Sequence, residues 1–137
     1  MKEINKFIIE KLRINKDTGK GKYSYKYHPK TKEELRKILE KRLKIDKNTN
    51  LNDIDVSNIT DMGVDDENIG LFDGLDPHNI DISEWNVSNV TNMKYMFFNC
   101  RNFNSDLSNW DVSNVDDMGD MFIDSPLEKN PPKWYKD

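Results

Sequence analysis

The sequence predicts an α/β fold: a short solenoid of about three 25-residue strand–turn–helix units behind a helix–strand–helix N-terminal cap. A repeat is the first observation behind this prediction. The stretch DISEWNVSNVTNMKYMFFNC, residues 81–100, returns 25 residues later as DLSNWDVSNVDDMGDMFIDS, residues 106–125. The second observation is that charge and apolar spacing both change near residue 50. Together they predict one repeating part and one cap.

The charge division sets the expected boundaries. Residues 1–50 contain 16 Lys and Arg against 7 Asp and Glu, whereas residues 51–137 contain 5 against 18. Two segments of opposite charge indicate two structural parts. We therefore predict three parts of the chain: a basic N-terminal cap at 1–49, an acidic repeat array at 50–126 and a C-terminal cap at 127–137.

The N-terminal cap is predicted from its apolar spacing. A first helix is expected from one stripe at helical spacing, which comprises Ile4, Phe7, Ile8 and Leu12. In KYSYKYH, residues 22–28, tyrosines alternate with Lys and Ser, which is the period of a strand. Thr31 and Glu34 have the spacing of a capping box. A second helix should follow, with an apolar stripe of Leu35, Ile38, Leu39 and Leu43 and with basic residues on its other face.

Each repeat unit is predicted to combine a strand and a short helix. Trp110 and Val112 alternate as on a strand with one buried face. Apolar residues at steps of three or four follow, as on a helical turn: Val115, Met118, Met121 and Phe122. Serines precede this turn, at positions that suit N-capping: Ser57, Ser88 and Ser113. One unit cannot bury its apolar face alone, so neighbouring units should stack and bury Trp110 between them.

An older copy of the unit lies upstream, with a bulge. Leu51, Ile54, Val56, Ile59 and Met62 precede their equivalents by 31 residues, whereas Leu71 and Phe72 keep the 25-residue offset. Six extra residues around VDDENI, residues 64–69, account for the difference. A fragment of a fourth copy, with Leu127 and Trp134, closes the chain.

The repeat carries a family resemblance. ISEWNVSNVTNMKYMF and LSNWDVSNVDDMGDMF resemble the BspA-type bacterial leucine-rich repeat, formerly a domain of unknown function found in mycoplasma surface proteins. The resemblance covers about residues 50–125. The basic start and the PPKWYKD end resemble the caps of short, signal-less members, some of which phages and prophages carry. The resemblance implies a strand-lined solenoid that binds proteins, and it implies no catalytic residues.

The predicted partner-binding residues lie on two surfaces. Residues beside the inward Trp and Val of each unit should point outward and form a polar, partly acidic face: Asp53, Asp55, Glu84, Asn86, Asn109 and Asp111. The acidic bulge should add Asp65, Asp66 and Glu67. Rows of aspartates are also compatible with Ca²⁺, but no dense binding-loop motif occurs, so we assign them to turns and expect no metal or cofactor. We also expect no catalytic residue, because no motif pairs a nucleophile with a base.

The sequence predicts non-catalytic protein binding through the repeat surface, and the alternative is an inhibitor. Residues 51–128 contain 17 acidic residues against Lys94 and Arg101, a field that attracts basic protein surfaces. A phage-borne, anti-CRISPR-like inhibitor would use this acidic surface to block a host defence or nucleic-acid-handling protein. Direct nucleic-acid binding by the Lys–Tyr alternation is disfavoured, because the array would repel phosphate.

Composition supplies the remaining expectations. The chain has no run of about 18 apolar residues, so we expect no membrane span. The start lacks the pattern of a signal peptide, which predicts a cytoplasmic protein in a bacterial or phage-infected cell. Cys100 takes the place of Leu75 in the preceding unit and should be a buried small apolar residue. We expect a monomer.

Overall fold

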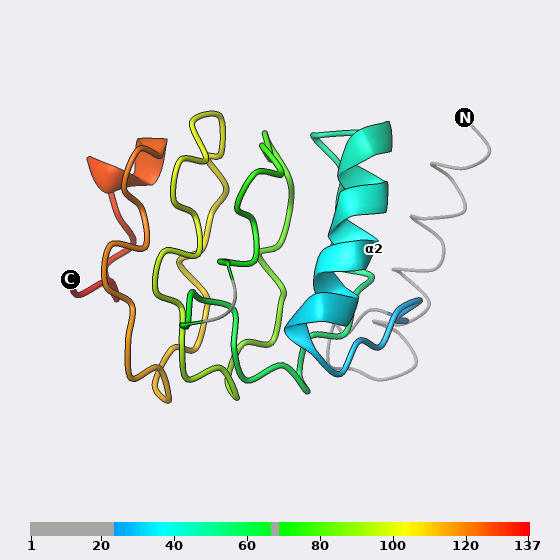
Figure 1. The fold of residues 1–137 in the computed structure, drawn as a ribbon, viewed down its shortest axis with the longest axis horizontal. Helices are drawn as coiled ribbons and strands as arrows, with labels where there is room; N and C mark the ends of the chain where they lie inside the picture. Colours follow the sequence, from blue (N-terminus) through cyan, green and yellow to red (C-terminus); the bar gives the residue numbers. More distant parts are fainter. Residues whose placement is uncertain (1–23, 67–68) are drawn as a thin grey trace.

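The computed structural model describes residues 24–66 and 69–137 and shows a row of coils closed at both ends (Figure 1). The helix α2, Lys32–Ile45, lies at one end of the row. The 3-10 helix η1, Pro126–Glu128, lies at the other end with the C-terminal segment. The predicted helix with Ile4 and Phe7 falls outside the described residues.

The predicted α/β solenoid of strand–turn–helix units is wrong. Within residues 24–66 and 69–137, α2 is the only α-helix and no strand forms. Adjacent coils are joined instead by isolated parallel bridges, such as Asn50 to Asp81 and Asp61 to Asn92. The predicted strand at 22–28 also fails over its described part, where Tyr27 forms only a bridge to Ile54.

Consecutive turns take the place of the predicted helices. Amide groups bond to the carbonyl three residues earlier at Trp110 to Leu107, Val115 to Val112 and Phe103 to Cys100. Apolar residues at steps of three or four can therefore all point inward without a continuous helix. Left-handed residues interrupt the turns at equivalent places in three units: Gly74, Asn99 and Asp124, with φ of 75°, 59° and 59°. Gly, Asn and Asp are the residues that tolerate this conformation best.

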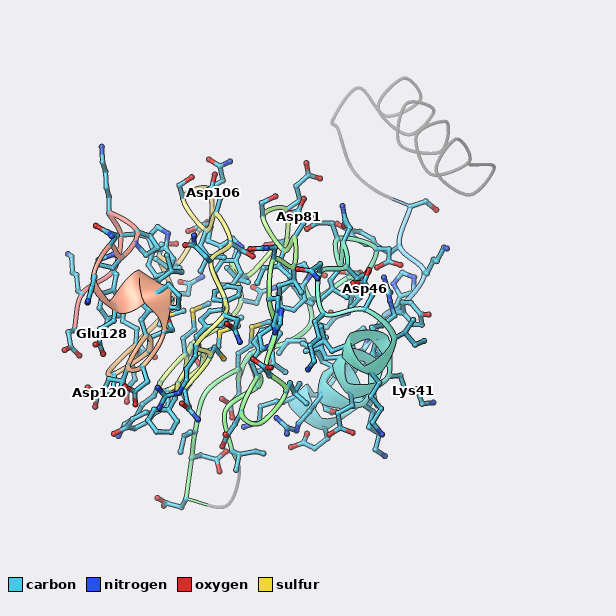
Figure 2. All side chains as sticks on the ribbon, turned by 90° about the horizontal axis from the view of Figure 1, so that it is seen from above. Lys41, Asp46, Asp81, Asp106, Asp120 and Glu128 are labelled. Carbon is cyan, nitrogen blue, oxygen red and sulfur yellow. The ribbon has the colours of Figure 1, made fainter. Side chains whose placement is uncertain are left out.

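The corners of the coils are built by Asp and Asn side chains. Each accepts a hydrogen bond from the backbone N–H two residues later, so that three rows of equivalent turns run along the stack: Asn50, Asp81 and Asp106; Asp55, Asn86 and Asp111; Asp61, Asn92 and Asp117. Figure 2 shows Asp81 and Asp106 on one edge of successive coils. The predicted serine N-caps are reversed, because the hydroxyls of Ser57, Ser88 and Ser113 donate to the preceding Asp or Asn.

Two ladders of aromatic rings form the core. Trp85, Trp110 and Trp134 stack with centroids 6.4 and 6.3 Å apart and planes within 11°. Phe72, Phe97 and Phe122 form the second ladder, with spacings of 5.2 and 5.7 Å. The predicted burial of Trp110 between units is confirmed, since only 4% of the residue is exposed. The two complete copies each supply one ring to each ladder, whereas the first copy supplies Phe72 alone and has Ile54 at the place of the tryptophan.

The helix α2 covers the first coil with apolar and basic side chains. Thr31 accepts from the amide of Glu34, as the capping box predicts, while the Glu34 carboxylate accepts from Lys30 rather than from Thr31. The buried residues Leu35, Leu39 and Leu43 confirm the apolar stripe. Basic side chains of the helix also reach the array. Lys32, which is 7% exposed, donates to the Gly63 carbonyl at 2.7 Å.

Candidate functional site at the bulge

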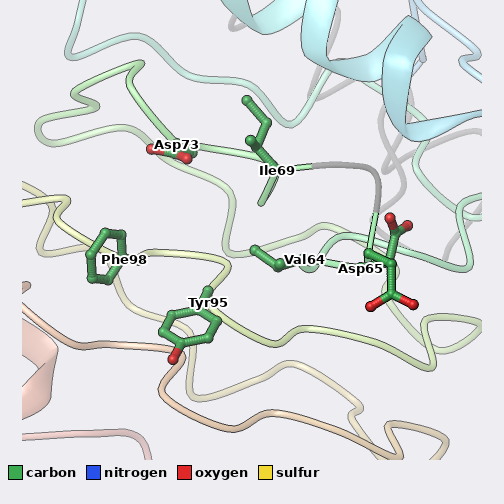
Figure 3. A pocket seen from close by; sticks show the side chains of 7 residues that line it. Val64, Asp65, Ile69, Asp73, Tyr95 and Phe98 are labelled. Atoms are coloured by element: carbon green, nitrogen blue, oxygen red, sulfur yellow. The ribbon is translucent and has the colours of Figure 1, made fainter.

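A pocket of about 610 Å³ opens where the bulge of the first unit meets the second unit (Figure 3). Its lining combines carboxylates, aliphatic side chains and aromatic rings: Val64, Asp65, Asp66, Ile69, Asp73, Tyr95 and Phe98. Figure 3 shows Tyr95 and Phe98 on one side and Asp65 on the other, with Val64 between them. This volume lies in the range of small-ligand and side-chain pockets.

Two of the pocket residues are exposed apolar side chains. Among the described residues, only four large hydrophobic side chains are exposed: Tyr27, Ile45, Ile69 and Phe98. Ile69 is 49% exposed and Phe98 is 37% exposed, and both line this pocket. Single exposed apolar residues are ordinary on protein surfaces, but apolar residues gathered in a rimmed hollow indicate an interaction site.

The residues at the start and just after the end of the bulge both contact the second unit. The Val64 amide donates to the Lys94 carbonyl at 2.8 Å, and the Asn92 side chain donates to the Val64 carbonyl at 3.1 Å. Gly70 approaches the backbone so closely that a Cβ there would lie 2.7 Å from the Tyr95 carbonyl oxygen. A glycine is needed where two chain segments come this near.

Arg36 of α2 fixes the return of the bulge. Its guanidinium donates to the carbonyls of Gly70, Leu71 and Asp73 at 3.2, 3.0 and 2.6 Å. Planar guanidinium groups hold several acceptors in a fixed geometry. The segment that carries Ile69 and Asp73 is therefore positioned by the cap as well as by the second unit.

Tyr95 is held in an uncommon backbone conformation. Its φ of 57° places an aromatic residue in the left-handed region, where such residues are rare and often mark functional positions. The side chain hydrogen-bonds with Asp120, and this bond, together with the Asp120 charge, raises the pKa of the Tyr95 hydroxyl. Phe98 lies edge-on to the Tyr95 ring at 5.6 Å, and the Lys94 ammonium lies 5.7 Å from the Tyr95 centroid.

Asp53 and Asp55, which were predicted to bind a partner, contact the cap. Both carboxylate oxygens of Asp53 accept from Nη1 of Arg42 at 3.1 Å, and the Asp53 side chain is 16% exposed. Asp55 lies 3.4 Å from His28 and accepts from both the amide and the hydroxyl of Ser57. Burial acts to raise the pKa of Asp55, but the Ser57 bonds and His28 outweigh it and the pKa is lowered.

The other predicted face residues remain exposed. Glu84, Asn86, Asn109 and Asp111 all lie at the surface, and Asn86 and Asp111 also cap turns. Hydrogen bonds from the hydroxyl and amide of Ser113 lower the pKa of Asp111. Their partner-binding role stays a prediction.

The predicted bulge residues Asp65 and Asp66 line the pocket, and Glu67 lies outside the described residues. Sequence reasoning missed Ile69, Asp73, Tyr95 and Phe98. A signal for the aromatic pair was present in the repeat. Tyr95 takes the place of Gly70 and Asp120, and Phe98 the place of Asp73 and Ile123, so neither ring is required by the repeat pattern.

Three further expectations concern metal ligands, Cys100 and membrane-spanning helices. Residues 24–66 and 69–137 contain no group of three His, Cys, Asp or Glu arranged to hold a metal ion. Cys100 is buried as predicted, at 1% exposure, and burial with the charges of Asp73 and Asp76 raises its pKa to about 12. No helix within the described ranges is long and apolar enough to cross a membrane.

Comparison with known proteins identifies a family. No curated protein and no solved structure matches the chain. A family model described as "Mycoplasma protein of unknown function, DUF285" matches residues 33–135, which contain all of α2 except its first residue, all the coils and most of the C-terminal segment. This match confirms the predicted link to a mycoplasma domain, while the leucine-rich-repeat assignment stays a prediction. The chain belongs to the DUF285 family of mycoplasma proteins of unknown function.

Proposed function

We propose that this chain is a non-catalytic module that binds a protein partner through its repeat surface, at the pocket around the bulge. One observation carries the proposal: Ile69 and Phe98 expose apolar surface in a hollow bordered by carboxylates. Protein interfaces commonly place aromatic side chains at the centre and polar groups at the rim. The pocket has this arrangement.

The polar, partly acidic face that the sequence predicts supports partner binding less strongly than the bulge pocket does. Asp53 and Asp55 are engaged with the cap, so the outward face is narrower than the sequence suggested. Four members of the predicted face remain exposed on two adjacent coils: Glu84, Asn86, Asn109 and Asp111. A standard interface buries about 800 Å² on each partner, which requires more than this strip. The bulge pocket supplies the apolar surface that the strip lacks.

A capture experiment with matched variants tests the proposal. The full chain, tagged and immobilised, is exposed to lysate of its native host, and bound proteins are identified by mass spectrometry. We expect a protein that is retained by wild type and lost with the Ile69→Ser, Phe98→Ser double variant. Ile45→Ser is the matched control, because Ile45 is 86% exposed at the end of α2 and lies outside the pocket. Equal loss in both variants, or retention in both, would contradict the proposal.

A further inference from the structure

We infer that the bulge pocket receives a lysine or arginine side chain of the partner protein; this inference rests on the proposed function. The pocket presents three carboxylates, Asp65, Asp66 and Asp73, at a single opening. It lies in an array with 17 acidic against 2 basic residues between 51 and 128. Such a field attracts positive charge and steers basic surfaces towards the opening.

The aromatic side of the pocket is suited to a cation. Cations bind over aromatic rings within about 6 Å of the centroid. The Tyr95 ring already accepts one, because the Lys94 ammonium lies 5.7 Å from its centroid. Phe98 stands edge-on to Tyr95 at 5.6 Å and 88°, so the two rings form two walls of a corner. This corner can contact two sides of a flat guanidinium or an ammonium.

The aliphatic side of the pocket fits the stem of the same side chain. Val64 lies between the aromatic corner and Asp65 (Figure 3), and Ile69 lines the same pocket. Lysine and arginine carry three or four methylene groups before their charge, and such stems pack on apolar surface while the head reaches polar groups. A neutral apolar side chain would use Val64 and Ile69 but would make no ion pair with Asp66 or Asp73.

The pocket walls are held in place before any partner arrives. The Tyr95 amide donates to the Gly119 carbonyl at 3.1 Å, which ties the backbone of Tyr95 to the next unit. The return of the bulge is held by Arg36 at Gly70, Leu71 and Asp73. A site whose walls are fixed in advance loses less conformational entropy when it binds.

Three short peptides test the inference on the full chain. The probes are acetyl-glycyl-arginyl-glycinamide, its citrulline counterpart, which has the same shape without the charge, and its norleucine counterpart, which is apolar. Binding is followed by the amide resonances of Val64, Ile69, Tyr95 and Phe98 in ¹H–¹⁵N spectra. We expect the arginine peptide to shift these resonances saturably, the citrulline and norleucine peptides to bind more weakly, and added salt to weaken the arginine peptide only.

Variants then locate the contacts. Asp66→Asn should weaken the arginine peptide about two- to fivefold, the range for exposed ion pairs. Phe98→Ala should weaken it about two- to fivefold through loss of the ring face. Asp106→Asn is the charge-matched control at a different pocket, and Asn50 shows that Asn can cap the same corner. We expect no change in the control.

The outcomes separate this inference from the proposed function. Stronger binding of norleucine than arginine would overturn the cationic ligand and leave the partner-binding pocket in place. Equal weakening by Asp106→Asn and Asp66→Asn would overturn it as well, because only the overall charge would then matter. If no peptide shifts the pocket resonances, the inference is overturned, and the capture experiment with Ile69→Ser, Phe98→Ser still decides the proposed function.

Discussion

The indole nitrogen of Trp110 donates a hydrogen bond to the carbonyl oxygen of Ile82 in the preceding unit, at 3.0 Å. Trp85 makes the same contact with Leu51 at 2.9 Å, and Trp134 makes it with Leu107 at 2.8 Å. Each tryptophan therefore joins two units twice, by stacking of its ring and by one bond to a backbone carbonyl. Each of these carbonyls also accepts the amide three residues later in its own unit, so the indole is a second donor to it.

Replacing Trp110 by Phe should separate these two contributions. The phenyl ring can still stack, but the Ile82 carbonyl loses one of its two donors and keeps the Trp85 amide at 3.1 Å. We therefore expect the free energy of unfolding to fall by about 0.5–1.5 kcal/mol, the net contribution of one hydrogen bond. Trp110→Ala should cost about 3–5 kcal/mol. Urea denaturation followed by circular dichroism measures both. Trp134→Phe is the control at the partly exposed end of the ladder and should cost less; a larger loss there would contradict this account.

Arg42→Lys should loosen the N-terminal cap while keeping its charge. Arg42 bonds to both Asp53 carboxylate oxygens and to the Asn50 carbonyl, which a lysine ammonium cannot reproduce in this geometry. We expect a loss of about 1–3 kcal/mol in urea denaturation. Lys41→Ala, on the exposed face of the same helix, should change stability by less than about 0.5 kcal/mol. Equal effects of the two variants would show that the bonds of Arg42 to Asp53 and Asn50 do not stabilise the protein.

Asp111→Asn should keep the turn and remove its pH dependence. Asn86 already caps the equivalent turn with the same two bonds, so the amide should replace the carboxylate at neutral pH. The folded-state pKa of Asp111 lies below the ordinary 3.8, so its contribution to stability is present above pH 3.8 and is lost as pH falls through the lowered value. Wild type should therefore lose more thermal stability than Asp111→Asn when the pH is lowered.

Asp111→Ala is the matched control, because it removes the acceptor altogether. Its melting temperature should be lower than that of wild type at pH 7, whereas Asp111→Asn should match wild type there. If all three proteins melt alike at pH 7, the Ser113 bonds do not stabilise the turn.

Cys100 should resist thiol reagents in the native protein. Its pKa of about 12, against an ordinary 9.0, leaves almost no thiolate at pH 8, and its side chain is buried between coils. We expect iodoacetamide to label the protein only after denaturant is added, as measured by mass spectrometry. Rapid labelling without denaturant would show that the coils around Phe97 and Phe103 open readily.

Variants on two different surfaces should distinguish the two predicted modes of partner binding, because added salt weakens both. An inhibitor acting through the acidic surface would lose affinity steeply with salt and would also lose it with Glu84→Lys and Asn109→Lys. A partner held mainly by the bulge pocket should respond to Ile69→Ser and Phe98→Ser and only weakly to those two changes. Calorimetric titrations of an identified partner with these variants measure the difference. We expect the second pattern.

The repeat register and the core could be predicted from the sequence, because large apolar residues recur at fixed offsets. Leu51, Trp85, Met96, Phe97 and Trp110 are buried as their spacing requires. Secondary structure could not be predicted in the same way. Steps of three or four suit a helix, but they also suit successive turns, and Asn or Asp at every corner favours turns through side-chain bonds to the backbone.

The candidate site was only partly predictable. The six-residue insertion located the bulge, and Asp65 and Asp66 do line the pocket. Tyr95 and Phe98 lie within the helix-like part of the repeat, where the predicted helix gave no reason to place them beside the bulge. The contact of Arg36 with the Asp73 carbonyl depends on how α2 packs against the coils, which the sequence pattern does not specify.

Because neighbouring coils meet through equivalent contacts, the length of the array is not fixed by its ends. A duplicated copy of residues 81–105 would bring its own tryptophan, its own phenylalanine and its own corner residues, and it would meet matching partners on both sides. The contacts of α2 at one end of the row and of the Trp134 segment at the other end would stay the same. Gene duplication could thus lengthen this protein from the middle, with the bulge pocket kept at a constant distance from the N-terminal end.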